Sequence, residues 1–335
     1  MRDWVKGLMS RKVYMVALVL LVLGVSGYFM KSQLVNAGRG VAGPSYSEMS
    51  MDNNQTGAVP GSTTAPPETN GASGPKNSGS SVGDPEVISG ASVAEKPSGA
   101  PASSQLSNAK HGWGMKRNSS HLQPEMPVSI SAGLSKYGAY WIGSPNEKAV
   151  YLTFDNGYEN GYTAGILDTL KANNVKAAFF ITGHYLDTQP ELVKRMVSEG
   201  HIVGNHTDTH PSLPDITDEQ IKKELQTVER GFEKTTGVKT MKYLRPPKGE
   251  YSERTLAVTR ELGYHNIFWS LALVDWVPMP GGPEEAYQSV MDNLHNGALI
   301  LLHTVSKDDA MAMDRILKDM KAQGYTFKTL DDLVK

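Results

Sequence analysis

The sequence contains no cysteine. Disulfide bonds and thiolate metal sites are therefore excluded, and His, Asp, Asn and Glu remain as the possible metal ligands. A strong net charge is also absent, because 33 Lys and Arg residues oppose 35 Asp and Glu residues, giving a formal net charge of -2. This balance provides no basic footprint for nucleic acid, so we expect no nucleic-acid partner, and charge alone identifies no protein partner.

An uncharged, largely apolar run occupies residues 13–30 and is just long enough to span a bilayer. Basic residues within 1–12 precede it, which predicts a cytoplasmic N-terminus and places the rest of the chain outside the membrane. The run is longer than most signal-peptide cores, which favours an uncleaved transmembrane anchor. A signal peptide cleaved near Ala37, which would give a secreted protein, is the alternative.

Residues 31–112 are rich in Gly, Ser, Pro, Ala, Asn and Thr and show no sustained period. Such a segment cannot bury enough apolar surface to offset the entropy of ordering it. We therefore expect a disordered linker that tethers one folded domain, residues 113–335, to the membrane.

The rest of the chain alternates between two kinds of pattern, with a regular core at about 147–330. Strands are predicted at 149–154, 176–182, 201–205, 241–245, 265–271, 298–303 and 325–329. Amphipathic helices are predicted at 162–173, 190–198, 218–234, 253–262, 284–294 and 308–322. This alternation predicts an α/β fold, a parallel sheet wrapped by helices, either open or closed into a barrel.

Unusual polar residues follow the predicted strands and decide between these two forms. Each of five strands ends in or just before one of them. They are Asp155, His206 with His210, Arg245, Asp275 and His303. A barrel gathers residues from many strand ends around one mouth, whereas an open sheet concentrates its site at one switch point. We therefore expect a barrel, and seven strands make it a distorted (β/α)7 barrel.

The pair His206 and His210 is a candidate metal site. If the turn after the strand is helical, a spacing of four residues points both imidazoles the same way. Imidazoles are good ligands for divalent metals. Asn156, or alternatively Asp155, could add an oxygen ligand and leave positions open for water and substrate, as in a catalytic zinc site.

Two further pairs suggest acid and base chemistry. Arg245 could hold a carboxylate bidentately, and Asp155 is its natural partner. Asp275 would favour the protonated form of His303, which suits a general acid. Trp276 could line the pocket. Each motif alone has a plainer explanation, such as a helix cap, a surface turn, a packed tryptophan or a satisfied core histidine.

Together the motifs resemble those of the NodB-homology family of polysaccharide deacetylases, which occur in the same order. The matching strings are TFDNG at Thr153, HTDTH at His206, RPPKG at Arg245, DW at Asp275 and LLH at Leu301. The similarity covers residues 113–335, and the longer strings look like those of the branch that forms muramic lactam. That branch removes the acetyl group from N-acetylmuramic acid in spore-cortex peptidoglycan.

The resemblance implies metal-dependent deacetylation of peptidoglycan glycan strands, leading to muramic δ-lactam, with zinc as the expected ion. It implies metal binding by His206, His210 and Asn156. The implied catalytic residues are Asp155 as the base, Arg245 as its orienting partner, and His303 tuned by Asp275 as the acid. The implied substrate-binding residues are Pro247, Lys248, Gly249, Trp276 and Leu301.

Two departures from the family pattern matter. Asn156 stands where most members have a second aspartate, and an amide is the weaker ligand. Lys248 replaces a common aromatic residue and makes the mouth more cationic, which suits an anionic glycan. The alternatives are a deacetylase of N-acetylglucosamine in peptidoglycan or chitin, and a wall-binding protein with a decayed site, which only Asn156 favours.

Overall fold

The computed structural model describes residues 105–117 and 120–335. The expected cytoplasmic segment at 1–12, the expected span at 13–30 and most of the expected linker lie outside the described residues. Within the part that is described, no helix combines the length and the apolar character needed to cross a membrane. The anchor therefore remains a prediction from the sequence.

In the described residues, nine strands form one parallel sheet in the order β1-β6-β5-β4-β3-β2-β8-β7, with β9 against β2. The strands are β1 (Ala139–Tyr140), β2 (Ala149–Asn156), β3 (Ala178–Ile181), β4 (Ile202–Asn205), β5 (Tyr243–Leu244), β6 (His265–Ile267), β7 (Leu271–Ala272), β8 (Ala298–His303) and β9 (Thr326–Phe327). All predicted strands are present, and one of them is divided into β6 and β7. The sheet curls into an incomplete barrel, which confirms the expected fold class.

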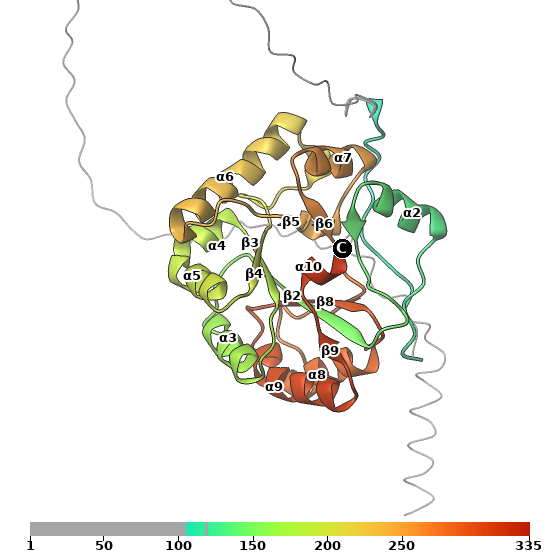
Figure 1. The fold of residues 1–335 in the computed structure, drawn as a ribbon, viewed down its shortest axis with the longest axis vertical. Helices are drawn as coiled ribbons and strands as arrows, with labels where there is room; N and C mark the ends of the chain where they lie inside the picture. The colour runs from blue at the N-terminus through green and yellow to red at the C-terminus, as the bar shows by residue number, and fades with distance from the viewer. Residues whose placement is uncertain (1–104, 118–119) are drawn as a thin grey trace, which may run out of the picture. The chain divides into compact units, whose positions relative to one another are not determined.

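Helices surround the sheet (Figure 1). They are α2 (Val128–Lys136), α3 (Thr163–Ala172), α4 (Gly183–Thr188), α5 (Pro190–Ser198), α6 (Asp218–Thr236), α7 (Glu253–Glu261), α8 (Gly282–Asp292), α9 (Lys307–Ala322) and α10 (Leu330–Leu333). The six predicted helices correspond to α3 and α5 to α9. A capping box formed by Thr217 and Gln220 begins α6, with both of its hydrogen bonds present.

Strand β2 is buried along its whole length because both of its faces are covered. Val150, Leu152 and Phe154 pack in the layer between the sheet and the helices. Ala149 and Tyr151 alternate with them and pack in a second cluster inside the barrel. This burial explains why the strand reads as a continuous apolar run.

The barrel has a seam where the chain changes its pairing partner between β6 and β7. Strand β6 pairs with β5 and β1, whereas β7 pairs with β8. Between the two strands, Phe268 N–H donates to Tyr140 O at 2.8 Å and Ser270 N–H donates to Leu299 O at 2.8 Å. The predicted strand at 265–271 is divided because its two ends complete different parts of the sheet.

Trp113 covers this seam from outside the regular elements. Its indole stacks on Phe268 with ring centroids 4.3 Å apart, and its Nε1–H donates to Trp269 O at 3.0 Å. Only 3% of Trp113 is exposed. The segment before α2 is therefore an integral part of the fold.

The folded region begins earlier than the expected boundary at residue 113. Asn108 Nδ2 donates to Pro214 O at 2.9 Å, and His111 and Tyr251 pair through two backbone hydrogen bonds. The expected linker, 31–112, is thus wrong for its last residues. Polar side chains and backbone groups make these contacts, so the sequence shows no hydrophobic period there.

The amino-terminal end of the barrel is closed by a tight backbone contact and by α10. Gly143 N–H donates to Gly297 O at 2.8 Å. Helix α10 lies in the middle of the helical ring (Figure 1) and buries Leu330 against the barrel interior. The hydroxyl of Tyr243 donates to Asp331 Oδ1 at 2.6 Å. The amino-terminal end of the barrel is therefore plugged.

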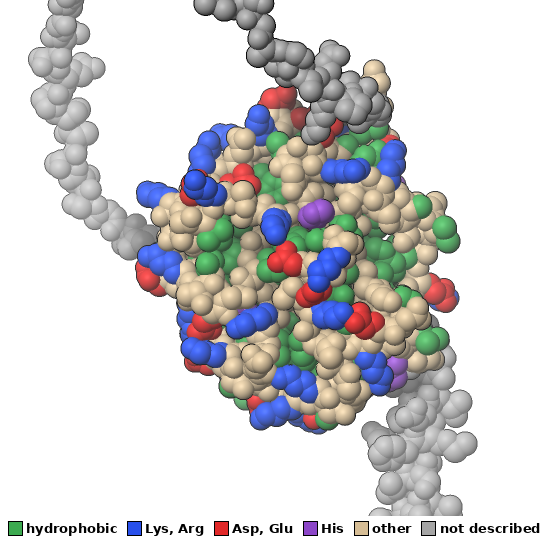
Figure 2. Space-filling view, in the orientation of Figure 1, with side chains coloured by type: hydrophobic (Ala, Val, Ile, Leu, Met, Phe, Trp, Pro, Cys, Tyr) green, Lys and Arg blue, Asp and Glu red, His purple; other side chains and the backbone are tan. Residues whose placement is uncertain are grey.

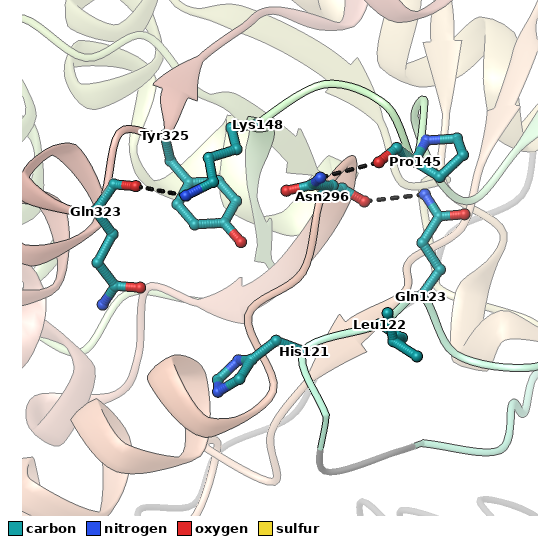
Figure 3. Close-up of a pocket in the computed structure, with 8 residues that line it drawn as sticks. All are labelled: His121, Leu122, Gln123, Pro145, Lys148, Asn296, Gln323 and Tyr325. Carbon is teal, nitrogen blue, oxygen red and sulfur yellow. Dashed lines mark hydrogen bonds between the residues drawn. The ribbon is translucent and has the colours of Figure 1, made fainter.

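A hollow of about 330 Å³ lies near the starts of β2, β8 and β9 (Figure 3). It is lined by His121, Leu122, Gln123, Pro145, Lys148, Asn296, Gln323 and Tyr325. Its polar groups bond to one another: Asn296 Nδ2 donates to Pro145 O at 2.9 Å, and Lys148 Nζ donates to Gln323 O at 3.0 Å. It is distinct from the mouth, because β8 separates it from His303.

We expect Gly297→Ala to destabilise the fold by about 2–4 kcal/mol, through left-handed strain and overpacking. The φ of Gly297 is +73°, and an added Cβ would lie 2.5 Å from the carbonyl carbon of Gly143. Gly237→Ala is the matched control, because its φ is +76° but nothing lies within 4 Å of an added Cβ. Urea unfolding measures both changes, and equal losses of stability would contradict the proposed close contact.

Candidate active site

The carboxyl ends of the strands bring the expected polar residues to one mouth. Asp155, near the end of β2, is in register with His303 at the end of β8. His206 directly follows β4, Arg245 directly follows β5, and Asp275 comes shortly after β7. Because all these strands are parallel, their side chains meet at the same end of the barrel.

Arg245 is fully buried in the site, with 0% of its side chain exposed. Its Nη1 donates to Asp155 Oδ1 at 2.7 Å and its Nη2 to Thr153 Oγ1 at 2.8 Å, while its Nε donates to Ile267 O at 3.1 Å. The guanidinium lies 4.2 Å from the ring centre of Phe180. Asp155 is thus the predicted partner, but the bidentate pairing is wrong, because the second nitrogen serves Thr153.

Asp155 is held ionised by its surroundings. Burial opposes the charged form, but Arg245 first, and then His206 and His303, outweigh it and lower the pKa of Asp155. Its Oδ2 lies 3.5 Å from His206 Nε2, which is too far for a strong hydrogen bond. The carboxylate of Asp155 is therefore ionised at neutral pH, and its Oδ2 makes no strong hydrogen bond to His206.

His206 and His210 come together, although the turn that carries them is not helical. Residues 206–212 have no helix, and the backbone is left-handed at Thr207 (φ 66°) and His210 (φ 58°). Thr207 N–H donates to Asn205 Oδ1 at 2.8 Å, and His210 N–H donates to Thr207 Oγ1 at 3.0 Å. This tight loop sets the two imidazole centres 4.7 Å apart.

Both imidazoles are held neutral with a ring nitrogen available. Burial lowers the pKa of His206, and burial followed by repulsion from His206 lowers the pKa of His210 to about 3. His206 Nδ1 hydrogen-bonds to Arg245 O at 2.8 Å, so it carries the proton and leaves Nε2 as an electron-pair donor. An outer hydrogen bond of this kind is typical of metal-ligating histidines.

Asn156 is fully buried and uses only half of its amide. Its Nδ2 donates to Thr304 Oγ1 at 2.7 Å, whereas its Oδ1 accepts no hydrogen bond within the described residues. A buried amide oxygen without a partner is unfavourable by about 1–3 kcal/mol. A cation at this position would satisfy the oxygen, so the residues present fit a metal ion.

The same residues limit the kind of metal site that can form. Among residues 105–117 and 120–335, no group of three or more His, Asp or Glu side chains is arranged to hold a metal. The available donors are two imidazole nitrogens and a neutral amide oxygen. A site with this donor set carries less negative charge than one with a ligating carboxylate.

His303 and Asp275 form a tight pair on the other side of the mouth. His303 Nδ1 lies 2.7 Å from Asp275 Oδ1, and His303 N–H donates to Asp275 Oδ2 at 2.7 Å. Burial opposes protonation of the imidazole, but the Asp275 carboxylate outweighs burial and raises the pKa of His303. Trp276 stands edge-on to His303, with ring centroids 5.1 Å apart, and is half-buried.

The predicted substrate-binding residues occupy different environments. Pro247 and Gly249 are buried in a short 3-10 turn, while Lys248 between them is exposed and has left-handed backbone (φ 60°). Lys248 acts electrostatically on His210, which places it near the mouth. Leu301 is 4% exposed and packs in the barrel interior, so it can contribute only to the floor of the site.

Two threonines were missed as contributors to the site. Thr153 hydrogen-bonds to Arg245, and Thr304 hydrogen-bonds to Asn156. Thr153 opens the TFDNG string, and Thr304 directly follows LLH. A threonine carries no chemical signal of its own there, because strands commonly contain it.

Comparison with known proteins identifies the family. A family model for polysaccharide deacetylase matches residues 142–267. An uncharacterized 30.6 kDa protein of Geobacillus stearothermophilus is 54% identical over 233 residues, which cover 69% of this chain and 88% of that protein. The chain belongs to the polysaccharide deacetylase family and is a hydrolase of amide bonds in polysaccharide.

Within this family the chain is similar to proteins with assigned names. The peptidoglycan-N-acetylmuramic acid deacetylase PdaA of Bacillus subtilis is 46% identical over 237 residues, covering 70% of this chain and 90% of PdaA. The solved structure of PdaA, described as a family 4 carbohydrate esterase, matches with a TM-score of 0.66 and 47% identity, over 68% of this chain and 98% of that one. A family 4 carbohydrate esterase from Bacillus anthracis matches with a TM-score of 0.58 and 45% identity, over the same shares.

We expect Arg245→Leu to destabilise the fold by about 3–5 kcal/mol, because it leaves the Asp155 carboxylate buried and uncompensated. Adding Asp155→Asn to that variant removes the stranded charge and should recover part of the loss. Arg315→Leu is the control, because Arg315 forms an exposed ion pair with Glu284 and its loss should change little. Urea unfolding at neutral pH gives these values, and a double variant no more stable than Arg245→Leu would refute the reasoning.

Proposed function

We propose that this chain removes the acetyl group from N-acetylmuramic acid residues of peptidoglycan, which permits muramic δ-lactam to form in the spore cortex. One observation of the structure carries the chemistry: an ionised carboxylate, Asp155, and an imidazole with a raised pKa, His303, lie in register at one mouth. Similarity to PdaA supports the choice of sugar. Opposed base and acid groups are what amide hydrolysis requires.

The proposal includes a divalent metal ion held by His206, His210 and Asn156. Neutral imidazoles and an amide oxygen that lacks a partner are suitable donors, and the mixture of nitrogen and oxygen ligands is compatible with zinc. When bound, such an ion supplies Lewis acidity, which polarises a carbonyl and lowers the pKa of water.

Asp155 acts as the general base in this proposal. Its lowered pKa keeps it ionised at neutral pH, and Arg245 fixes its Oδ1. The remaining oxygen, Oδ2, is the one that can take a proton from the attacking water. Oδ2 lies 3.5 Å from His206 Nε2, which supports proton transfer next to the proposed metal ligands.

His303 acts as the general acid. Asp275 accepts the hydrogen bond from Nδ1, so the second proton of the imidazolium is on Nε2. From there it can be delivered to the nitrogen of the departing amine. The raised pKa of His303 keeps this acid protonated near neutral pH.

The turn at Pro247–Gly249 contributes a backbone donor. Gly249 N–H donates to Pro246 O and Glu250 N–H donates to Pro247 O, both at 3.1 Å. The N–H of Lys248 is left without a partner in the described residues and can stabilise the oxyanion of the tetrahedral intermediate. The exposed ammonium group of the Lys248 side chain can attract the lactyl carboxylate of muramic acid.

The expected location agrees with a wall substrate. If residues 13–30 anchor the chain and 31–104 tether it, the folded region works outside the membrane among glycan strands. Cleavage near Ala37 would release the same region as a secreted enzyme. Positive and negative side chains are mixed on the face shown in Figure 2, in keeping with the low net charge of the chain.

We expect His210→Ala to lose bound metal and turnover together, because it removes one of two nitrogen ligands. Asn156→Asp should bind metal more tightly, since it adds a negative ligand. Metal content after dialysis against graded chelator measures both changes. Unchanged metal in His210→Ala, or weaker binding in Asn156→Asp, would remove the assigned ligand set.

Asp155→Asn is the matched control for this experiment. It keeps the shape of the base and should retain the metal, while lowering the turnover number on the order of a hundredfold or more. Turnover within a few-fold of the unaltered protein would show that Asp155 is not the base.

The substrate is tested by incubating the protein with peptidoglycan stripped of peptide, with intact peptidoglycan and with chitin oligomers. Digestion and mass analysis then locate the lost acetyl groups. We expect deacetylated muramic acid, mainly in the stripped polymer. Deacetylated glucosamine with untouched muramic residues would establish the N-acetylglucosamine alternative, and no release from any polymer would favour a wall-binding role.

A further inference from the structure

Behind the acid pair lies a carboxyl group to which the mechanism assigns no role. Asp309 is in the first turn of α9 and has 0% of its surface exposed. Its backbone N–H donates to the hydroxyl of Ser306, the N-cap residue, at 3.1 Å. Its side chain is thus fixed at the base of the helix, just after the strand that carries His303.

The ordinary explanation of an acidic residue at this position is a helix cap. In a capping box the side chain of the third helical residue would accept the N–H of the N-cap residue. Here Ser306 N–H donates instead to His303 O at 3.1 Å. Within the described residues no N–H group donates to either carboxyl oxygen of Asp309, and the polar side chains beside the carboxyl group are those of Asp275 and Ser306. Asp309 therefore does not complete the cap.

A buried carboxylate that accepts no N–H group is strongly unfavourable, so Asp309 is neutral. Besides the hydroxyl of Ser306, the Asp309 carboxyl group is hydrogen-bonded to the carboxyl group of Asp275. Two carboxyl groups can share a hydrogen bond only if one of them carries a proton. His303 holds the pKa of Asp275 below its usual value, whereas burial and the adjoining Asp275 carboxylate raise the pKa of Asp309 well above it.

We propose that Asp309 is a positioning residue: a neutral carboxylic acid that donates a hydrogen bond to Asp275 and so sets the orientation and acidity of His303. Asp275 then receives three donors, His303 Nδ1–H, His303 N–H and the Asp309 hydroxyl. A carboxylate has about four acceptor sites, so it can accommodate all three. The proposal rests on His303 being the general acid.

The donor moderates the pKa of His303. Spreading the negative charge of Asp275 onto a third donor weakens its hold on the imidazolium, so His303 releases its proton more easily to the amine. The other charged groups that act on His303 are Asp155 and Arg245, and Asp308 also acts on Asp309. Asp309 therefore opposes part of the rise in the His303 pKa that Asp275 causes.

The test compares Asp309→Leu, which removes the donor, with Asp309→Asn, which keeps a neutral donor of the same shape. In Asp309→Leu we expect the His303 pKa, and the alkaline limb of the turnover number with it, to move upward by roughly one pH unit. The turnover number at neutral pH should fall severalfold. In Asp309→Asn both quantities should return close to those of the unaltered protein.

Asp308→Asn is the control for loss of charge. It removes a carboxylate from the same helical turn but keeps the oxygen that accepts the N–H of Met279. The full-length chain is used, with acetate release from peptide-free peptidoglycan and NMR titration of ring-labelled histidine as the two measurements. Only the titration is independent of substrate, so failure of the proposed activity leaves the link from Asp309 to His303 testable.

Two outcomes would overturn the proposal. The first is a His303 pKa in Asp309→Leu equal to that of the unaltered protein while the fold is retained. The second is an equal shift in Asp309→Asn and Asp309→Leu, which would mean that Asp309 acts through a negative charge. If Asp309→Leu does not fold, the titration of Asp309→Asn decides. An ionised Asp309 would raise the pKa of His303, so replacing it with Asn would lower that pKa. A lowered His303 pKa in Asp309→Asn would therefore overturn the proposal.

Discussion

The buried ion pair between Arg245 and Asp155 joins the architecture of the barrel to its chemistry. Arg245 hydrogen-bonds to two side chains of β2 and to the backbone at the end of β6, so one guanidinium connects the centre of the sheet to its seam. A charge placed at this depth is tolerated only when every donor is engaged. Asp155 is therefore the counterion that lets the arginine remain buried, and its ionised state follows from the fold.

The order of strands and helices could be predicted from the sequence because both faces of the sheet are covered. Burial on both sides made β2 and β8 read as apolar runs, and the polar residues after them marked the mouth. The division of one predicted strand into β6 and β7 could not be foreseen. The strand is divided because β6 and β7 pair with different strands, and local composition does not indicate which distant strand a segment pairs with.

The sequence predicted which residues form the site better than it predicted their geometry. Residue type suggested that Asp155 pairs with Arg245 and that His303 pairs with Asp275, and the structure contains both contacts. The spacing of the two histidines would bring them together on a helical turn, but here a loop with two left-handed residues brings the rings together. Such a loop depends on Asn205 and Thr207 bonding to the backbone, a local arrangement that spacing alone does not encode.

The pairing of His111 with Tyr251 has a mechanical consequence. These two backbone hydrogen bonds attach the beginning of the folded region right after the turn at Pro247–Gly249, and Trp113 packs within 2.6 Å of where a Cβ on Gly249 would lie. A force pulling on the chain ahead of residue 105 would act first on the hydrogen bonds of Ser107 and Asn108 and then on this pairing. The beginning of the folded region and the turn at Pro247–Gly249 are therefore mechanically coupled, so such a force would be transmitted to the mouth of the barrel.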